Sequence, residues 1–358
     1  MKNTRQVKIQ QKKRILVAPL NWGLGHATRC IPIIRALITH QFEPIIASDG
    51  VALQLLIKEF PDLDYIALPS YHITYPKNGK FFKLKMFWST PKLLKAIKAE
   101  NHMVTAIIKS HDIQGIISDN RFGVYHDTLP SVFITHQLQV LSGNTTWLST
   151  KLHQRIIKRF DECWVPDTVG DTNLSGKLSH TRNAELPVKF IGCLSRFKKT
   201  ERSITYNVMV LISGPEPQRT CLETKLRSEF KNFGGKVLFV RGVVEKVRKV
   251  SEERNMTVYN YMTSSQLETA INESELIVSR SGYTTIMDLA RMRKKAFFIP
   301  TPGQFEQEYL AERLTRLGYV ASCKQGDFSL SCLEDIANTK GLSPVDHDLN
   351  YAALFGLF

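Results

Sequence analysis

A glycine-rich turn with a histidine is the first group of residues that could do chemistry. It follows an apolar segment and reads Asn21-Trp22-Gly23-Leu24-Gly25-His26-Ala27-Thr28-Arg29. Gly23 and Gly25 let the backbone turn tightly, and the helix expected to begin here offers N–H groups to an anion. At this helix start the pKa of His26 should be lowered, so that its neutral imidazole accepts a proton from a hydroxyl group. An ordinary turn, with His26 capping its own helix, is the structural alternative.

A second turn of this kind lies in the last third of the chain. An apolar segment ends in Ser279-Arg280-Ser281-Gly282, and a helical pattern follows it. Ser281 and Gly282 would offer a hydroxyl group and backbone N–H groups to a phosphate at the helix N-terminus. Asp288, less than two turns into that helix, could accept two hydrogen bonds from a ribose diol. After the next strand, a Pro-Thr-Pro-Gly turn leads to polar side chains at 304–308 that face the same cleft.

The elements that must position these turns alternate between strands and helices. In the first half we expect strands at 14–22, 43–49, 64–70, 115–119, 131–136, 162–167 and 188–194, and helices at 27–40, 51–60, 91–109 and 147–160. In the second half we expect strands at 207–213, 236–241, 256–261, 276–279 and 296–300, and helices at 218–230, 265–272, 284–292 and 305–317. Near-continuous apolar strands between helices predict parallel sheets covered on both faces.

The 358 residues suit two domains better than one. Residues 195–206 are polar, charged and poor in apolar side chains, which is typical of a linker. We therefore predict an α/β protein of two doubly wound, Rossmann-like domains, comprising residues 14–196 and 205–358. Ligands should bind at the carboxyl ends of the strands, in the cleft between the domains.

The two turns carry a resemblance to a known family. The pattern strand–S-R-S-G-x-x-T-x-x-[DE]-L, followed by strand–P-x-P-x-x-x-x-Q, resembles the nucleotide-sugar site of GT-B glycosyltransferases. The pattern is similar to that of the bacterial peptidoglycan N-acetylglucosaminyltransferases and their looser, MurG-like relatives, whose glycine-rich turn with histidine resembles W-G-L-G-H-A-T-R. The resemblance spans roughly residues 14–320. It implies the GT-B fold and an inverting transfer of a sugar from a nucleotide, expected to be UDP, to an acceptor hydroxyl.

The resemblance also implies roles for particular residues. Its donor contacts fall on Tyr261 and Met262 near the uracil, Ser213 and Gly214 in a glycine turn, Arg280, Ser281 and Gly282 at the diphosphate, Asp288 at the ribose and Gln307 at the sugar. Its acceptor side falls on Gly23, Gly25 and His26. Three departures stand out: the family's G-G-S-Q is Ser213-Gly214-Pro215-Glu216 here, Asp288 replaces a glutamate, and Trp22 and Leu24 replace smaller residues. The acceptor should therefore differ from that of the peptidoglycan enzyme.

Two further polar residues end predicted strands near His26. They are Asp119 and His136, and either could bind the acceptor, orient the base or cap local structure. We expect His26, or failing that Asp119, to take the proton of the acceptor hydroxyl. The leaving diphosphate would be stabilised by N–H groups at a helix N-terminus, so we expect neither a metal nor another cofactor.

The positive charge is concentrated in the first half of the chain. The net charge is +15 overall, of which residues 1–200 carry +14. Residues 77–109 hold eight lysines and a single acid, interleaved with large apolar side chains. Such a segment suits an anionic membrane surface or single-stranded nucleic acid, or it is a solvated helix face over a buried aromatic cluster. Because there is no RNA-binding motif, we expect a membrane rather than a nucleic acid.

The remaining features indicate the cellular compartment of the protein and leave two alternative functions open. Six scattered cysteines without C-x-x-C spacing, and the absence of a signal peptide or long apolar run, predict a cytoplasmic protein that contacts the membrane peripherally. Its partners would be a nucleotide-sugar donor and a glycan or lipid-linked acceptor. The alternatives are a sugar-nucleotide epimerase with the same donor site, and a binding protein for nucleic acid or anionic surfaces.

Overall fold

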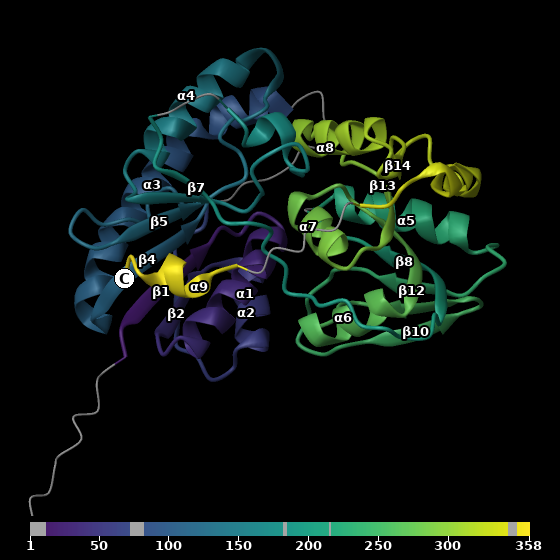
Figure 1. Cartoon of the computed structure of the whole chain (residues 1–358), viewed down its shortest axis with the longest axis horizontal. Coiled ribbons are helices and arrows are strands. Elements are labelled where there is room, and N and C mark those ends of the chain that lie inside the picture. The colour runs from purple at the N-terminus through teal and green to yellow at the C-terminus, as the bar shows by residue number, and fades with distance from the viewer. Residues whose placement is uncertain (1–11, 72–81, 182–184, 215, 343–348) are drawn as a thin grey trace, which may run out of the picture.

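The computed structural model describes residues 12–71, 82–181, 185–214, 216–342 and 349–358, without the side chains of 82–92. These residues form two sheets, one in each half of the chain, and helices pack around each sheet (Figure 1). This arrangement confirms the predicted α/β class with two doubly wound domains.

The first sheet has seven parallel strands in the order β3-β2-β1-β4-β5-β6-β7. They are β1 (Arg14–Pro19), β2 (Glu43–Ser48), β3 (Tyr65–Ala67), β4 (Ile113–Asp119), β5 (Ser131–Ile134), β6 (Glu162–Val165) and β7 (Val188–Phe190). In β1, Ile15 and Val17 join one buried apolar cluster, whereas Leu16 and Ala18 join another. Both faces of the sheet are therefore covered, as the continuous apolar strands predicted.

The helices of the first domain connect these strands. They are α1 (Gly25–Thr39), α2 (Gly50–Glu59), α3 (Phe82–His111) and α4 (Thr146–Ile157), with short 3₁₀ turns at Gly143–Thr145 and Gly176–Leu178. Helix α3 begins at Phe82, earlier than the predicted start at residue 91. Much of the lysine- and aromatic-rich segment 77–109 lies outside the described side chains. No helix in the described part of the chain is long and apolar enough to cross a membrane.

The second sheet also has seven strands, in the order β10-β11-β9-β8-β12-β13-β14. They are β8 (Tyr206–Leu211), β9 (Val237–Val240), β10 (Val250–Glu253), β11 (Met256–Tyr259), β12 (Ser274–Ser279), β13 (Lys295–Phe298) and β14 (Ala321–Ser322). All pairs are parallel except β10 with β11. The edge strand β10 was missed because its sequence, VSEE, has no apolar pattern and its residues are largely exposed.

The helices of the second domain connect its strands, and one of them contacts the first domain. They are α5 (Gln218–Phe230), α6 (Ser264–Asn272), α7 (Tyr283–Arg291) and α8 (Phe305–Arg316), with a 3₁₀ segment at Leu330–Asn338; the short helix α9 (Tyr351–Phe355) follows near the end of the chain. Helix α7 contacts α1 of the first domain. Because α1 and α7 both begin at the carboxyl end of a strand, the two sheets present those ends to one shared cleft.

The end of the chain corrects the predicted domain boundary. We expected the second domain to extend to residue 358, but α9 lies on the first domain, beside β1 and α1 (Figure 1). The ring of Phe355 packs on Phe42 and Trp164, at centroid distances of 5.7 and 6.5 Å. The ring of Phe358 lies 6.4 Å from that of Trp164. Because the chain returns to the first domain, these apolar side chains are buried there. The chain therefore connects the two domains at two places.

Candidate active site

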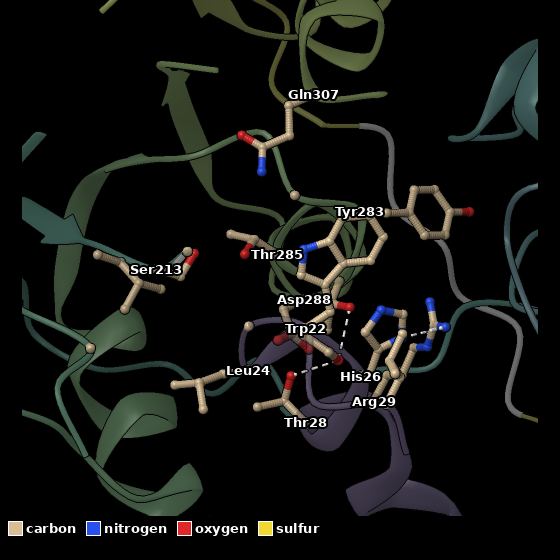
Figure 2. Close-up of a pocket in the computed structure, with 18 of the residues that line it drawn as sticks. Trp22, Leu24, His26, Thr28, Arg29, Ser213, Tyr283, Thr285, Asp288 and Gln307 are labelled. Carbon is tan, nitrogen blue, oxygen red and sulfur yellow. Dashed lines mark hydrogen bonds between the residues drawn. The ribbon is translucent and has the colours of Figure 1, made fainter. Parts of the chain in front are cut away.

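One pocket lies between the domains and gathers residues from both (Figure 2). Most of the predicted site residues line it: Gly23, Gly25, His26, Ser213, Gly214, Tyr261, Met262, Gly282, Asp288 and Gln307. Asp119, Arg280 and Ser281 do not line it. The pocket therefore unites the two turns that the sequence analysis singled out, although they lie more than 250 residues apart.

The first glycine turn connects β1 to α1 in a conformation that favours glycine. Gly23 has a φ of 73°, in the left-handed region that side chains with a Cβ disfavour. The carbonyl of Gly25 accepts hydrogen bonds from the hydroxyl groups of Thr28 and Thr284, each at 3.1 Å (Figure 2). Because Thr284 belongs to α7, this bond ties the first turn directly to the second domain.

His26 is held by Asp119 at the end of β4. Its Nδ1 lies 2.7 Å from Oδ1 of Asp119, and the carboxylate is fully buried. Nη2 of Arg29 lies 3.0 Å from the same Nδ1, but the carboxylate is closer and can only accept. The Nδ1–H therefore donates to Asp119, which leaves Nε2 as the proton-accepting atom. Asp119 was our second candidate for the base. The structure corrects that expectation, because Asp119 contacts His26 and Arg29 rather than the pocket.

Burial and neighbouring charges set the protonation of this pair. Burial is the main reason that the pKa of His26 is lowered, with a further contribution from Arg29, although Asp119 opposes the shift. For Asp119, burial raises the pKa, but the charge and hydrogen bonds of Arg29 and His26 outweigh it and bring it to about 2. His26 is thus neutral and Asp119 ionised near pH 7. The sequence had suggested a lowered pKa for His26 from the helix N-terminus, whereas burial is the larger cause.

Arg29 is a site residue that the sequence analysis passed over. It follows His26 by three positions on α1, is 1% exposed, and donates two hydrogen bonds to the carboxylate of Asp119. Its Nη1 also donates to Nδ1 of His136, at 2.9 Å. The available signal was an arginine three positions after His26, a spacing at which two side chains share one face of a helix.

The second glycine turn places its backbone, rather than its side chains, at the pocket. Gly282 is the N-cap residue of α7 and lines the pocket with Thr284 and Thr285. Ser281 is fully buried, and its hydroxyl group donates to the carbonyl of Gln307 at 2.7 Å. This corrects the expectation that the Ser281 hydroxyl would meet a phosphate.

Arg280 also turns away from the pocket. Its guanidinium donates to the carbonyls of Ile299 and Pro300, at 3.1 and 3.0 Å, and to that of Gln218, at 3.0 Å. Burial lowers its pKa to about 10, so it stays charged near pH 7. Arg280 therefore ties the end of β12 to neighbouring loops, and it does not contact the expected diphosphate site.

Asp288 lines the pocket but already has a partner. Its Oδ1 accepts a hydrogen bond from the hydroxyl of Ser195, at 2.7 Å, and its Oδ2 lies 3.9 Å from Nε of Arg196. Burial raises its pKa to about 6 despite these contacts. Ser195 and Arg196 come from the chain between β7 and β8, which has no helix or strand. A ribose hydroxyl that binds Oδ1 of Asp288 would compete with the hydroxyl group of Ser195.

The remaining predicted donor residues surround the pocket on the second domain. The carboxamide oxygen of Gln307 accepts a hydrogen bond from the N–H of Thr301 at 2.8 Å, and the side chain points towards the pocket (Figure 2). The N–H of Tyr261 donates to Oδ1 of Asn260, at 2.9 Å, so it is not available to a nucleobase. Within the described residues, no group of three or more His, Cys, Asp or Glu side chains is arranged to hold a metal ion.

Comparison with known proteins supports the same class of enzyme. Residues 219–339 match the glycosyltransferase family 28 C-terminal domain. The chain is 23% identical over 316 residues to an uncharacterized glycosyltransferase of Methanopyrus kandleri, covering 83% of this chain and 85% of that protein. It is 23% identical over 211 residues to the UDP-N-acetylglucosamine–N-acetylmuramyl-(pentapeptide) pyrophosphoryl-undecaprenol N-acetylglucosamine transferase of Haemophilus ducreyi, covering 57% of this chain and 56% of that enzyme.

Solved structures share the arrangement of the two domains. The glycotransferase of kitacinnamycin superposes with a TM-score of 0.61, at 13% identity, over 97% of this chain and 94% of that one. MurG of Acinetobacter baumannii superposes with a TM-score of 0.53, at 11% identity, over 91% and 90%. Two parallel-sheet domains around one cleft define the GT-B fold. The chain is a glycosyltransferase of this type, and it resembles the MurG-like enzymes.

Proposed function

We propose that the protein transfers a sugar from a UDP-linked donor to an acceptor hydroxyl with inversion at the anomeric carbon. The observation that carries this proposal is the pair formed by His26 and Asp119, 2.7 Å apart, in a pocket whose other wall is the N-terminus of α7. One wall thus offers a proton acceptor, and the other offers donors for an anion.

The transfer is a single displacement. The acceptor oxygen forms a bond to the anomeric carbon while the bond from that carbon to the diphosphate oxygen breaks, and its electron pair leaves with the diphosphate. The acceptor proton moves to Nε2 of His26, and the ionised Asp119 stabilises the resulting imidazolium. Backbone N–H groups at the start of α7, near Gly282 and Thr284, would stabilise the charge that develops on the diphosphate. This route uses no metal ion.

Two relatives support a nucleotide donor. The spinosyn rhamnosyltransferase SpnG, which shares the fold with a TM-score of 0.59, has been solved in complex with thymidine diphosphate. The Haemophilus ducreyi relative is named for UDP-N-acetylglucosamine. We therefore propose that a nucleoside diphosphate lies between α7, Tyr261 and Gln307, and that the base is uracil.

For the acceptor, we propose a lipid-linked molecule reached at an anionic membrane surface. Helix α4 carries Trp147, which is 72% exposed, with Leu148 and Leu152 about half exposed. Lys151 lies over the Trp147 ring, 5.4 Å from its centroid, and the helix has no acidic residue. Exposed apolar side chains with lysines suit an interface with anionic lipid. This helix belongs to the domain that carries almost all of the net charge.

Binding and product analysis test the proposal. The protein should be stabilised by UDP-sugars in a thermal-shift screen, and a ligand at 100 times its Kd should add about 2.7 kcal/mol. Conversion of a UDP-sugar without any acceptor would instead identify an epimerase. A salt-dependent shift of nucleic acid in a gel, without any stabilisation by nucleotide sugars, would identify a binding protein. Activity that persists in EDTA would support metal-independent transfer.

A further inference from the structure

A continuous chain of hydrogen bonds runs from the catalytic pair into the second domain. Arg29 donates to Asp119 and, through Nη1, to Nδ1 of His136 at 2.9 Å. Nε2 of His136 lies 2.7 Å from Oε1 of Glu306, in the first turn of α8. Gln137 donates to the other oxygen of Glu306. The base of the first domain is thus connected to a carboxylate of the second.

The donors and acceptors in this chain are fixed by chemistry. A guanidinium has only N–H donors, so Nδ1 of His136 must accept the bond from Arg29. The ring proton then lies on Nε2, where it is donated to the carboxylate of Glu306. His136 therefore has one defined tautomer, set by a cation on one side and an anion on the other.

Packing holds His136 in this orientation. Its ring stacks on that of Tyr283, with centroids 4.3 Å apart and planes within 7°. Tyr283 belongs to α7, and its hydroxyl group donates to the carbonyl of Pro166 in the first domain, at 2.9 Å. Arg29 and His136 are almost completely buried, at 1% and 5% exposure. An interaction through buried groups is screened little by water.

We propose that His136 is a positioning residue, which makes the alignment of His26 depend on the docking of the second domain. By accepting from Arg29 and donating to Glu306, His136 holds the guanidinium against Asp119, and Asp119 holds His26 in its Nδ1–H tautomer. Without either contact the guanidinium still pairs with Asp119, but it loses the support that reaches it from the second domain. The proposal rests on the proposed function only in that His26 serves as the base.

Ring nitrogen NMR of the full-length protein tests the positioning without any substrate. Two-bond ¹H–¹⁵N spectra distinguish the tautomers of His26, with its signals assigned from His26→Ala. The wild type should show His26 as a single Nδ1–H tautomer. His136→Phe keeps the ring stacked on Tyr283 but removes both nitrogens, and Glu306→Gln removes the charge at the far end of the chain. Each should give averaged or doubled His26 signals.

Glu308→Gln is the matched control, because it removes an acid from the same helical turn. Glu308 accepts a bond from the N–H of Gly303 and does not touch His136, so the His26 signals should stay as in the wild type. If His136→Phe does not fold, Glu306→Gln still decides the question. A single, unchanged His26 tautomer in folded Glu306→Gln and His136→Phe would overturn the proposal.

Kinetics give a second readout, with UDP-N-acetylglucosamine as the donor, water as the acceptor and release of UDP as the signal. Misplacing a catalytic group by about 1 Å can cost roughly 100-fold in rate. In both variants kcat should therefore fall about 10- to 100-fold, while KM changes less than about threefold. An unchanged kcat in both variants would contradict the proposal. If the wild type neither binds nor turns over any nucleotide sugar, the proposed function fails, and the NMR result still decides the role of His136.

Discussion

The hydroxyl group of Ser195 donates a 2.7 Å hydrogen bond to the carboxylate of Asp288. A residue of the chain between the domains therefore already binds the carboxylate that we expect to bind the ribose. Asp288 is 5% exposed, and Arg196 lies near its second oxygen. A ribose that binds Oδ1 of Asp288 would exchange the bond from Ser195 for its own. This exchange would link occupation of the donor site to movement of the chain between the domains.

Replacing Ser195 should strengthen nucleotide binding. Ser195→Ala removes a competitor for Asp288, and one hydrogen bond to a charged group contributes about 1.5–3 kcal/mol, so UDP should bind more tightly by at most about 10- to 150-fold. Asp288→Ala should weaken UDP binding by roughly 1.5–3 kcal/mol while the protein stays folded. Isothermal titration calorimetry with UDP measures both. Wild-type affinity in both variants would show that the ribose does not contact Asp288.

The raised pKa of Asp288 predicts a specific dependence of stability on pH. The folded protein holds this proton up to about pH 6, whereas the unfolded chain releases it near pH 3.8. The folded state is therefore favoured below pH 3.8, and this contribution is lost as the pH rises through 6, at a cost of about 3 kcal/mol. Asp288→Asn should gain that amount at pH 7 relative to the wild type. Urea unfolding from pH 4 to 7 checks this, and parallel curves for the two proteins would contradict it.

His153 should make stability depend on pH in the opposite direction, over nearly the same pH range. Burial lowers its pKa from 6.5 to about 4, with a smaller contribution from His136. The folded state excludes the proton that the unfolded chain binds, so stability falls as the pH drops from 6.5 to 4, by about 3 kcal/mol.

His153→Phe should remove this loss of stability at low pH. The His153 ring already packs edge-on against Phe122 and Phe133, which makes phenylalanine a matched replacement. In the wild type the effects of Asp288 and His153 partly cancel, so the two single variants should show pH profiles of opposite slope. A His153→Phe profile identical to that of the wild type would refute the assignment.

Removing the base should affect turnover rather than donor binding. His26→Ala is expected to lower kcat by about 10²–10⁴-fold, the usual contribution of a general base, with UDP affinity nearly unchanged. Asp119→Asn should also lower kcat, and because it leaves Arg29 without its counter-charge it should destabilise the fold by about 3–5 kcal/mol. Steady-state kinetics and denaturant unfolding separate these effects. A His26→Ala enzyme that keeps most of its kcat would assign the base elsewhere.

Vesicle binding tests the proposed membrane surface. If α4 and the lysine-rich segment 77–109 dock on anionic lipid, binding to anionic vesicles should exceed binding to neutral ones and weaken as salt rises. Trp147→Ser should reduce the binding, because its exposed ring would otherwise enter the interface. Replacing Lys80, Lys83 and Lys85 with glutamine should weaken it as well, without changing UDP affinity. Equal sedimentation with neutral and anionic vesicles would contradict this surface.

The sequence predicted the features that depend on neighbouring residues. Apolar strands alternating with helices predicted the two doubly wound domains, and the glycines at 23–25 and 282 predicted the turns that begin α1 and α7. These features follow from local backbone preference and from the burial of one run of residues at a time. Missed elements such as β10 have no apolar pattern and form only because a neighbouring strand supplies hydrogen bonds.

The tertiary structure decided which side chains meet. His26 and Asp119 are 93 residues apart, and only the parallel pairing of β1 with β4, in which Pro19 lies opposite Asp119, brings them together. Arg280 and Ser281 looked like phosphate ligands, yet packing against the loops around α8 turns both side chains away from the pocket. The direction of a side chain depends on every element packed around it. The sequence of one segment therefore determines where a turn forms, whereas the remainder of the fold determines what that turn contacts.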